Sequence, residues 1–261
     1  MPMKRPAAKS RPMKAVPKAA KSRPMKAVPK IAMKKKITKV TVPDDYRVFS
    51  APGKGGSDIN PKTTAVIFVE FQNEFCTPGG KLHDAVKETM AASGMLENAA
   101  GVAKAVRAAG AKVIHAPITF RPDGADNPNK NLGILAGCHK DQLFTIGSWN
   151  ADICEQMSPE ADDIVVVGKK GLSAFPGTDL EDQLRQHGIE TVALGGFMAN
   201  CCVESTMREA CEKGFNVITL TDCVATTSTE GLKAATEGTY TFFSQPMTAE
   251  AFKAKLTPAQ V

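Results

Sequence analysis

The chain has 261 residues, of which 43% are hydrophobic and 23% charged, a composition typical of a globular protein with one sizeable domain. No apolar run approaches the about 18 residues that span a bilayer, and no apolar signal core stands near the N-terminus. Seven cysteines without a disulfide-framework spacing predict reduced thiols. We therefore expect an intracellular, cytoplasmic protein, with a nuclear or organellar location left open by the basic N-terminal segment.

The formal net charge of +6 is divided between two unlike parts of the chain. Residues 1–39 hold 14 Lys or Arg and no acidic residue, whereas the rest holds 19 basic and 27 acidic residues. The string AAKSRPMKAVPK occurs twice in succession, at 7–18 and 19–30. Proline excludes a continuous helix there, and large apolar residues are too few to offset the entropy of ordering. We expect 1–39 to be a disordered basic tail, and 40–62 to be a linker to a domain at 63–261.

Three roles stay open for the basic tail. A solvated tail without a specific partner requires no further feature. Clustered Lys and Arg also favour binding to nucleic acid or an anionic surface through counterion release, although no aromatic residue among them offers a platform for base stacking. A targeting peptide is the third role, but frequent proline makes an amphipathic helix awkward.

After the linker, short apolar β-branched runs alternate with helical patterns. We predict strands at 65–71, 112–116, 163–167, 191–195, 216–220 and 240–243, and helices at 95–109, about 178–188, 201–213 and 229–236. Thr178 and Glu181 form a capping box for the second of these helices. The segment 117–150 lacks clear periodicity, which suits a lid or an oligomer contact. The alternation predicts an α/β fold: an open, mostly parallel, Rossmann-like sheet of about six strands with helices on both faces.

Chemically active side chains follow three of the predicted strands. They are Glu70 after the first, Lys169 and Lys170 after the third, and Cys201 and Cys202 after the fourth. Ligands bind beyond the carboxyl ends of parallel strands, so these residues share one rim. A helix start favours a thiolate, a carboxylate can accept the thiol proton, and a lysine can stabilise the anion. The alternatives are a small buried cysteine, a surface or capping carboxylate and solvated lysines.

Three stretches resemble the isochorismatase-like cysteine hydrolases, a family that includes nicotinamidases, ureidoacrylate and biuret amidohydrolases and isochorismatase itself. They read VIFVEFQNEF at 66–75, KKGLSAFPGTDL at 169–180 and GGFMANCCVESTMREACEKGF at 195–215. The resemblance extends over about 63–250. It implies a hydrolase that cleaves an amide, ureide or related C–N bond of a small molecule through a thioester on cysteine.

The Asp–Lys–Cys triad of that family maps onto Glu70, Lys169 and Cys202. Glutamate stands at the aspartate position, which keeps the charge, lengthens the side chain and leaves open whether activity is preserved. Lys170 is an alternative to Lys169, shifted by one residue. The resemblance also implies a cis peptide at Phe197–Met198.

Backbone N–H groups of Met198 and Cys202 would then form an oxyanion hole, aimed at the charge that develops in the transition state. Active sites of this family are often completed by a neighbouring subunit, so the resemblance further implies a homo-oligomer.

The histidine pattern does not match the metal site of the nicotinamidases, which use an Asp-x-His pair and a further histidine. The four histidines are His83, His115, His139 and His187, and none of them belongs to such a pair. No His-x-x-x-His or Cys-x-x-Cys pair is present either. We therefore expect no metal and no cofactor, with a role for His115 at the rim left open because it ends a strand.

Three further residues are expected around the substrate. Phe75 follows the first strand, and Trp149, the sole tryptophan, either shapes a small cavity or only packs. Asn73 orients Glu70 or caps a turn. Two functions stay open: a small-molecule cysteine hydrolase, or a catalytically weakened hydrolase-fold binding protein that the basic tail tethers to nucleic acid or an anionic surface.

Overall fold

The apolar β-branched runs form one six-stranded sheet, in the order β3-β2-β1-β4-β5-β6, in which every neighbouring pair is parallel. The computed structural model describes residues 59–256, so the basic tail and most of the linker lie outside the described residues. The strands are β1 Thr64–Val69, β2 Lys112–Ala116, β3 Ile164–Val165, β4 Thr191–Phe197, β5 Asn216–Ala225 and β6 Gln245–Met247. The predicted α/β fold with about six parallel strands is confirmed.

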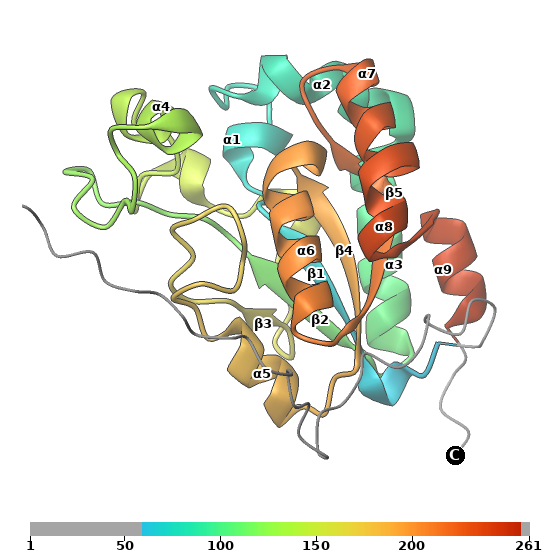
Figure 1. Ribbon diagram of the computed structural model, residues 1–261. Helices are drawn as coiled ribbons and strands as arrows, with labels where there is room; N and C mark the ends of the chain where they lie inside the picture. The colour runs from blue at the N-terminus through green and yellow to red at the C-terminus, as the bar shows by residue number, and fades with distance from the viewer. Residues whose placement is uncertain (1–58, 257–261) are drawn as a thin grey trace, which may run out of the picture. The chain divides into compact units, whose positions relative to one another are not determined.

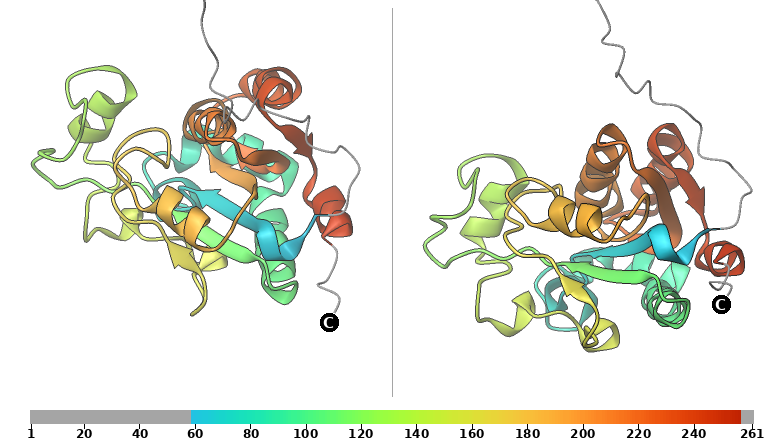
Figure 2. Two further views of the ribbon diagram at one scale, coloured as in Figure 1. Left: turned by 60° about the horizontal axis from the view of Figure 1, so that its bottom comes forward. Right: turned by 90° about the horizontal axis from the view of Figure 1, so that it is seen from below.

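Helices cover both faces of this sheet (Figures 1 and 2). The α-helices are α1 Asn73–Cys76, α2 His83–Ser93, α3 Met95–Ala108, α4 Gly133–Lys140, α5 Leu180–Gln186, α6 Glu204–Glu212, α7 Thr229–Lys233, α8 Tyr240–Phe243 and α9 Ala249–Lys255. Short 3₁₀ or π turns are η1 Pro61–Thr63, η2 Trp149–Ala151, η3 Glu155–Met157, η4 Ala199–Val203 and η5 Ala234–Thr239. No helix of the described residues is long and apolar enough to cross a membrane.

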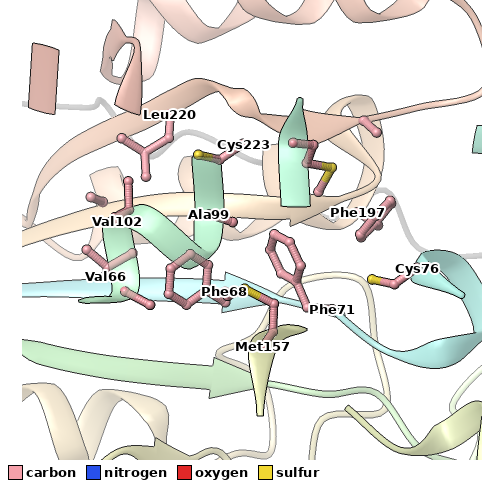
Figure 3. Packing of buried hydrophobic residues seen from close by; sticks show 14 of the residues in the cluster. Val66, Phe68, Phe71, Cys76, Ala99, Val102, Met157, Phe197, Leu220 and Cys223 are labelled. Carbon is pink, nitrogen blue, oxygen red and sulfur yellow. The ribbon is translucent and has the colours of Figure 1, made fainter. Parts of the chain in front are cut away.

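Alternate residues of β1 enter two separate hydrophobic clusters, because successive side chains of a strand point to opposite faces. Val66 and Phe68 pack with residues of α2, α3 and α9, and Figure 3 shows both beside Val102 of α3. Ile67 and Val69 instead pack with residues of α5 and α6. All six residues of β1 are buried, as a strand covered on both faces requires.

The prediction of a last strand at 240–243 was wrong. These residues form α8, in which the Tyr240 hydroxyl donates a hydrogen bond to the carbonyl of Ala199 and Phe242 is exposed. The last strand is β6, which pairs with β5 through Gln245 to Met247. Aromatic residues favour strands, but here the preceding turn η5 continues into the helix and tertiary packing overrides propensity.

Other elements differ from prediction mainly in their length. β3 keeps only Ile164 and Val165 of the predicted 163–167, whereas β4 and β5 extend beyond their predicted ends. The expected capping box is absent: Asp179 precedes α5, and Thr178 instead accepts a hydrogen bond from the Leu180 amide. The helices α2, α4 and α9 were not predicted, since each presents a narrow apolar stripe with few large residues.

Residues 59–62, expected within the linker, contact the fold. Ile59 is buried and forms a parallel bridge with Leu256, and its amide donates to the carbonyl of Lys255. Asn60 caps η1 by accepting from the Lys62 amide. The first described residues therefore lie beside the end of α9, away from the carboxyl ends of the strands.

Candidate active site

The sheet reverses its strand order between β1 and β4, and the candidate site lies at the carboxyl ends of these two strands. β1 ends at Val69, opposite Gly196 of β4. Gly196 has φ +138°, and a Cβ placed there would meet the carbonyl oxygen of Val69. Glycine is therefore required at this position, where the backbone of β4 approaches the backbone of β1 closely.

Glu70 leaves β1 in a left-handed backbone conformation, with φ +58°. Its amide donates to the carbonyl of Ala116 at the end of β2, and its carbonyl accepts from the amide of Gln72. A non-glycine residue adopts such a φ only where its surroundings compensate for the strain. The turn directs the Glu70 carboxylate into the interior, where the residue is 2% exposed.

Lys169 neutralises this buried carboxylate. Its Nζ donates to Oε1 of Glu70 at 2.5 Å and to the carbonyl of Gly171 at 2.7 Å, and the residue is 1% exposed. Burial is the largest single influence and disfavours the ammonium, but Glu70 and the two cysteines together outweigh it and raise the pKa of Lys169. Removing either member of the ion pair would leave the other buried without a partner of opposite charge.

Lys170 points elsewhere, so the geometry distinguishes the two lysines. Its Nζ donates to the carbonyl of Thr119 at 2.6 Å and pairs with Asp126 at 2.9 Å, on a partly exposed surface. Lys169 alone of the two contacts Glu70.

Cys202 lies in η4, the π turn that joins β4 to α6. Its carbonyl accepts from the Thr206 hydroxyl at 2.7 Å, and Thr206 in turn accepts from the Ala174 amide, so the turn is tied to the chain that follows Lys169. The peptide bond between Phe197 and Met198 is cis, as the family resemblance implied.

The surroundings of the Cys202 thiol disfavour its ionisation. A hydrogen bond with the Cys201 thiol, burial and the negative charge of Glu70 together raise the pKa of Cys202 well above the ordinary thiol value, and Lys169 only partly opposes them. The residue is 6% exposed. Burial and the negative charge of Glu70 therefore oppose the thiolate that a helix start, as expected from the sequence, would favour.

Glu70 and Cys202 line one cavity of about 320 Å³. Its remaining lining residues are largely apolar. They come from α1, α2, α4 and the loops around them, and from the segments that follow β3, β4 and β5: Phe75, Leu82, Ala85, Val86, Ile118, Ile134, Leu135, Gly137, Cys138, Asp141, Leu143, Phe144, Leu172, Met198 and Thr227. The segment 117–150 contributes eight of these residues: Ile118, and seven that lie between Ile134 and Phe144. This segment therefore forms a wall of the cavity.

Of the three residues expected around the substrate, the structure places only Phe75 in the cavity lining. The ring of Phe75 stacks on that of Phe197, with centroids 4.8 Å apart. Asn73 is buried and joins α1 to the segments around it. Its side-chain amide donates to the carbonyl of Trp149, and its side-chain oxygen accepts from the Thr77 hydroxyl. The Trp149 side chain is 51% exposed and lies outside the cavity lining.

Sequence reasoning missed two buried residues that hold the cavity wall. Gln72 donates to the carbonyls of Ile118 and Ala151 and accepts from the Ile118 amide. Glu74, fully buried, accepts from the amides of Lys81 and Phe144 and from the Asn150 side chain. A polar run directly after a buried strand was the available signal, because its side chains face the site end of the sheet.

The histidines are used in other ways. His115 is buried and its Nε2 pairs with Asp163 at 3.1 Å, so the open role at the rim is not realised. His83 Nδ1 lies 2.9 Å from the carbonyl of Phe75. Among residues 59–256, no group of three or more His, Cys, Asp or Glu is placed to hold a metal ion.

The family model for the isochorismatase domain matches residues 64–251 of this chain. The chain belongs to the isochorismatase family and is a hydrolase of that family. It is 31% identical over 210 residues to the ureidoacrylate amidohydrolase RutB of Methylobacterium radiotolerans, with 76% of this chain and 81% of the relative covered.

Solved structures show the same fold. A cysteine hydrolase from Pseudomonas syringae pv. phaseolicola matches with a TM-score of 0.67 at 27% identity, over 76% of this chain and 94% of that chain. The N-carbamoylsarcosine amidase from Thermoplasma acidophilum matches with a TM-score of 0.58 at 24% identity, over 72% and 97%.

Proposed function

We propose that the protein is a cysteine amidohydrolase that cleaves a C–N bond of a small amide or ureide, with Cys202 as nucleophile, Glu70 as proton acceptor and Lys169 as the fixed cation. The observation that carries this proposal is the buried Glu70–Lys169 pair at the base of a cavity that Cys202 also lines. The amidohydrolase and amidase relatives support the same bond type.

In the proposed reaction, Glu70 takes the proton of the Cys202 thiol as the sulfur attacks the carbonyl carbon. We propose that proton transfer accompanies the attack, in keeping with the raised pKa of Cys202. The backbone N–H groups of Met198 and Cys202 receive the oxyanion of the tetrahedral intermediate. Lys169 stays charged throughout and stabilises whichever of Glu70 and Cys202 is anionic.

Collapse of the intermediate breaks the C–N bond, and Glu70 returns its proton to the departing nitrogen. A water molecule then attacks the thioester while Glu70 accepts a proton from it, and the C–S bond breaks. The Cys202 sulfur regains a proton from Glu70. One turnover thus consumes one water and restores the resting site.

The adjacent cysteines offer a matched test. We expect Cys202→Ala to abolish the release of ammonia or amine from a panel of simple carboxamides and linear ureides, and Cys201→Ser to retain it. Mass spectrometry of acid-quenched protein during turnover should find the acyl adduct on the peptide that contains Cys202. Undiminished hydrolysis by Cys202→Ala would overturn the proposal.

A further inference from the structure

The described residues that line the cavity include no Lys, Arg or His. Their only charged members are Glu70, which pairs with Lys169, and Asp141 at the end of α4, which is exposed. The side-chain charges facing a bound molecule are therefore acidic.

Three lysines of nearby segments lie outside the cavity lining, and each has a partner. Lys81 donates to the carbonyls of Asp141 and Gln142 at 2.7 and 3.2 Å, and Lys170 pairs with Asp126. Lys169 is buried against Glu70 and lies outside the lining. A carboxylate entering the cavity would thus lose water without gaining a counter-ion, which is costly.

The walls are instead suited to apolar groups. Phe75 lies between the rings of Phe197 and Phe144, at centroid distances of 4.8 and 5.4 Å. Ile118 and Leu143 are buried beside them. The cavity of about 320 Å³ has the room of about ten water molecules, which is enough for a substituent the size of one ring or a branched alkyl chain.

We propose that the substrate of this chain is an uncharged amide or ureide with an apolar substituent, and that the cavity rejects carboxylate-bearing substrates. This inference rests on the proposed function for the reaction but on the cavity walls for the selectivity. An anionic acid such as a ureido-carboxylate is therefore a poor substrate for this chain.

Alkylation of Cys202 measures the selectivity without turnover. Iodoacetamide and iodoacetate are close in size and differ in charge, and peptide mass spectrometry reads both adducts. We expect the iodoacetamide-to-iodoacetate rate ratio at Cys202 to exceed the ratio in the urea-unfolded protein by about tenfold or more. An equal ratio in the folded and the unfolded protein would overturn the inference.

Two exposed residues of the α4 region give a matched pair of variants. Ile134 lines the cavity and is 46% exposed, whereas Leu132 is 68% exposed and does not line it. Ile134→Arg should supply the missing cation and lower the ratio toward that of the unfolded protein. Leu132→Arg adds the same charge outside the cavity and should leave the ratio unchanged; equal effects of both variants would refute a role for the cavity wall.

A substrate pair separates this inference from the proposed function. 3-Methylbutylurea and 3-ureidopropionate have nearly the same shape. The first carries an isopropyl group where the second carries a carboxylate. We expect kcat/KM for the neutral ureide to be higher by about a hundredfold. Cys202-dependent hydrolysis that favours the anion would refute the inference and leave the amidohydrolase proposal intact. Selective alkylation of Cys202 with no hydrolysis of any ureide or amide would refute the amidohydrolase proposal and leave the charge selectivity of the cavity intact.

Discussion

Glu70 occupies the position that the family resemblance assigns to aspartate. The longer side chain still forms the ion pair with Lys169, from a residue in a left-handed backbone conformation.

Replacing Glu70 by Gln should lower kcat by about 10²- to 10⁴-fold, since the proton acceptor is removed. Glu70→Asp keeps the carboxylate and is the matched control, with an expected loss well below that of the amide. Steady-state hydrolysis of the best substrate provides the measurement. Activity of Glu70→Gln within tenfold of the parent would exclude Glu70 as the base.

The same variant should have the opposite effect on thiol reactivity. The Glu70 charge helps to raise the pKa of Cys202 and Lys169 opposes it, so Glu70→Gln should lower that pKa. Alkylation of Cys202 by iodoacetamide at pH 7.5 is then expected to be faster in Glu70→Gln than in the parent, while hydrolysis is slower. Slower alkylation would mean that Glu70 already deprotonates the thiol at rest.

At the scale of elements, the contact between β1 and β4 fixes the site. Gly196→Ala should destabilise the fold by about 3 kcal/mol or more, because its Cβ would lie 2.0 Å from the Val69 oxygen. Gly238→Ala, where no heavy atom lies within 4 Å of the new Cβ, is the control. Urea unfolding of both variants tests this, and equal midpoints would contradict the expected clash.

Helix α1 carries the acceptor that holds the cavity wall. Glu74→Gln places an amide nitrogen against backbone donors, since one carboxylate oxygen accepts from Lys81 and the other from Phe144 and Asn150. We expect a loss of about 1–3 kcal/mol in unfolding free energy, faster proteolysis within 117–150 and a larger effect on KM than on kcat. Glu155→Gln, at an exposed site in η3, is the control. A change confined to kcat would speak against a positioning role.

For the whole molecule, buried thiols predict a loss of stability in alkali. Burial raises the pKa of Cys138 to about 12 and raises that of Cys223 further, whereas unfolded thiols ionise near about 8.5. A raised folded pKa means that stability is complete below the unfolded value and falls above it. Each thiol should contribute a loss of about 1.4 kcal/mol per pH unit above that value.

Urea unfolding under reducing conditions between pH 7.5 and 10 measures this slope. Cys223→Ala should reduce the slope of unfolding free energy against pH by the contribution of one thiol. Cys211→Ala, which removes a half-exposed thiol of α6, is the control. A slope that Cys223→Ala leaves unaltered would show that this thiol ionises equally in both states.

The homo-oligomer implied by family resemblance stays a prediction, as do the disordered tail at 1–39 and its binding to nucleic acid or an anionic surface. Binding to nucleic acid can be tested by measuring duplex DNA binding at rising salt, with and without residues 1–39. Binding that is driven by counterion release weakens steeply as salt is added.

The order of strands and helices, and the edge of the sheet at which the candidate site lies, could be predicted from the sequence. Buried β-branched runs separated by helical patterns allow few arrangements, and parallel strands bring Glu70, Lys169 and Cys202 to one edge whatever the details between them. Helix α3 and strand β2 were predicted closely because their apolar periodicity and glycine stops are local signals.

The sequence could not show which lysine faces Glu70, because two adjacent residues in a loop carry no periodic signal that distinguishes a buried side chain from an exposed one. Long-range contacts distinguish them. The tertiary structure also decided that Tyr240 begins a helix, that Trp149 lies outside the cavity and that Glu74 is buried. Each of these depends on contacts between residues distant in the chain, such as Tyr240 with Ala199 or Glu74 with Asn150. Local propensity is a fraction of a kcal/mol per residue, and such long-range packing and hydrogen bonds outweigh it.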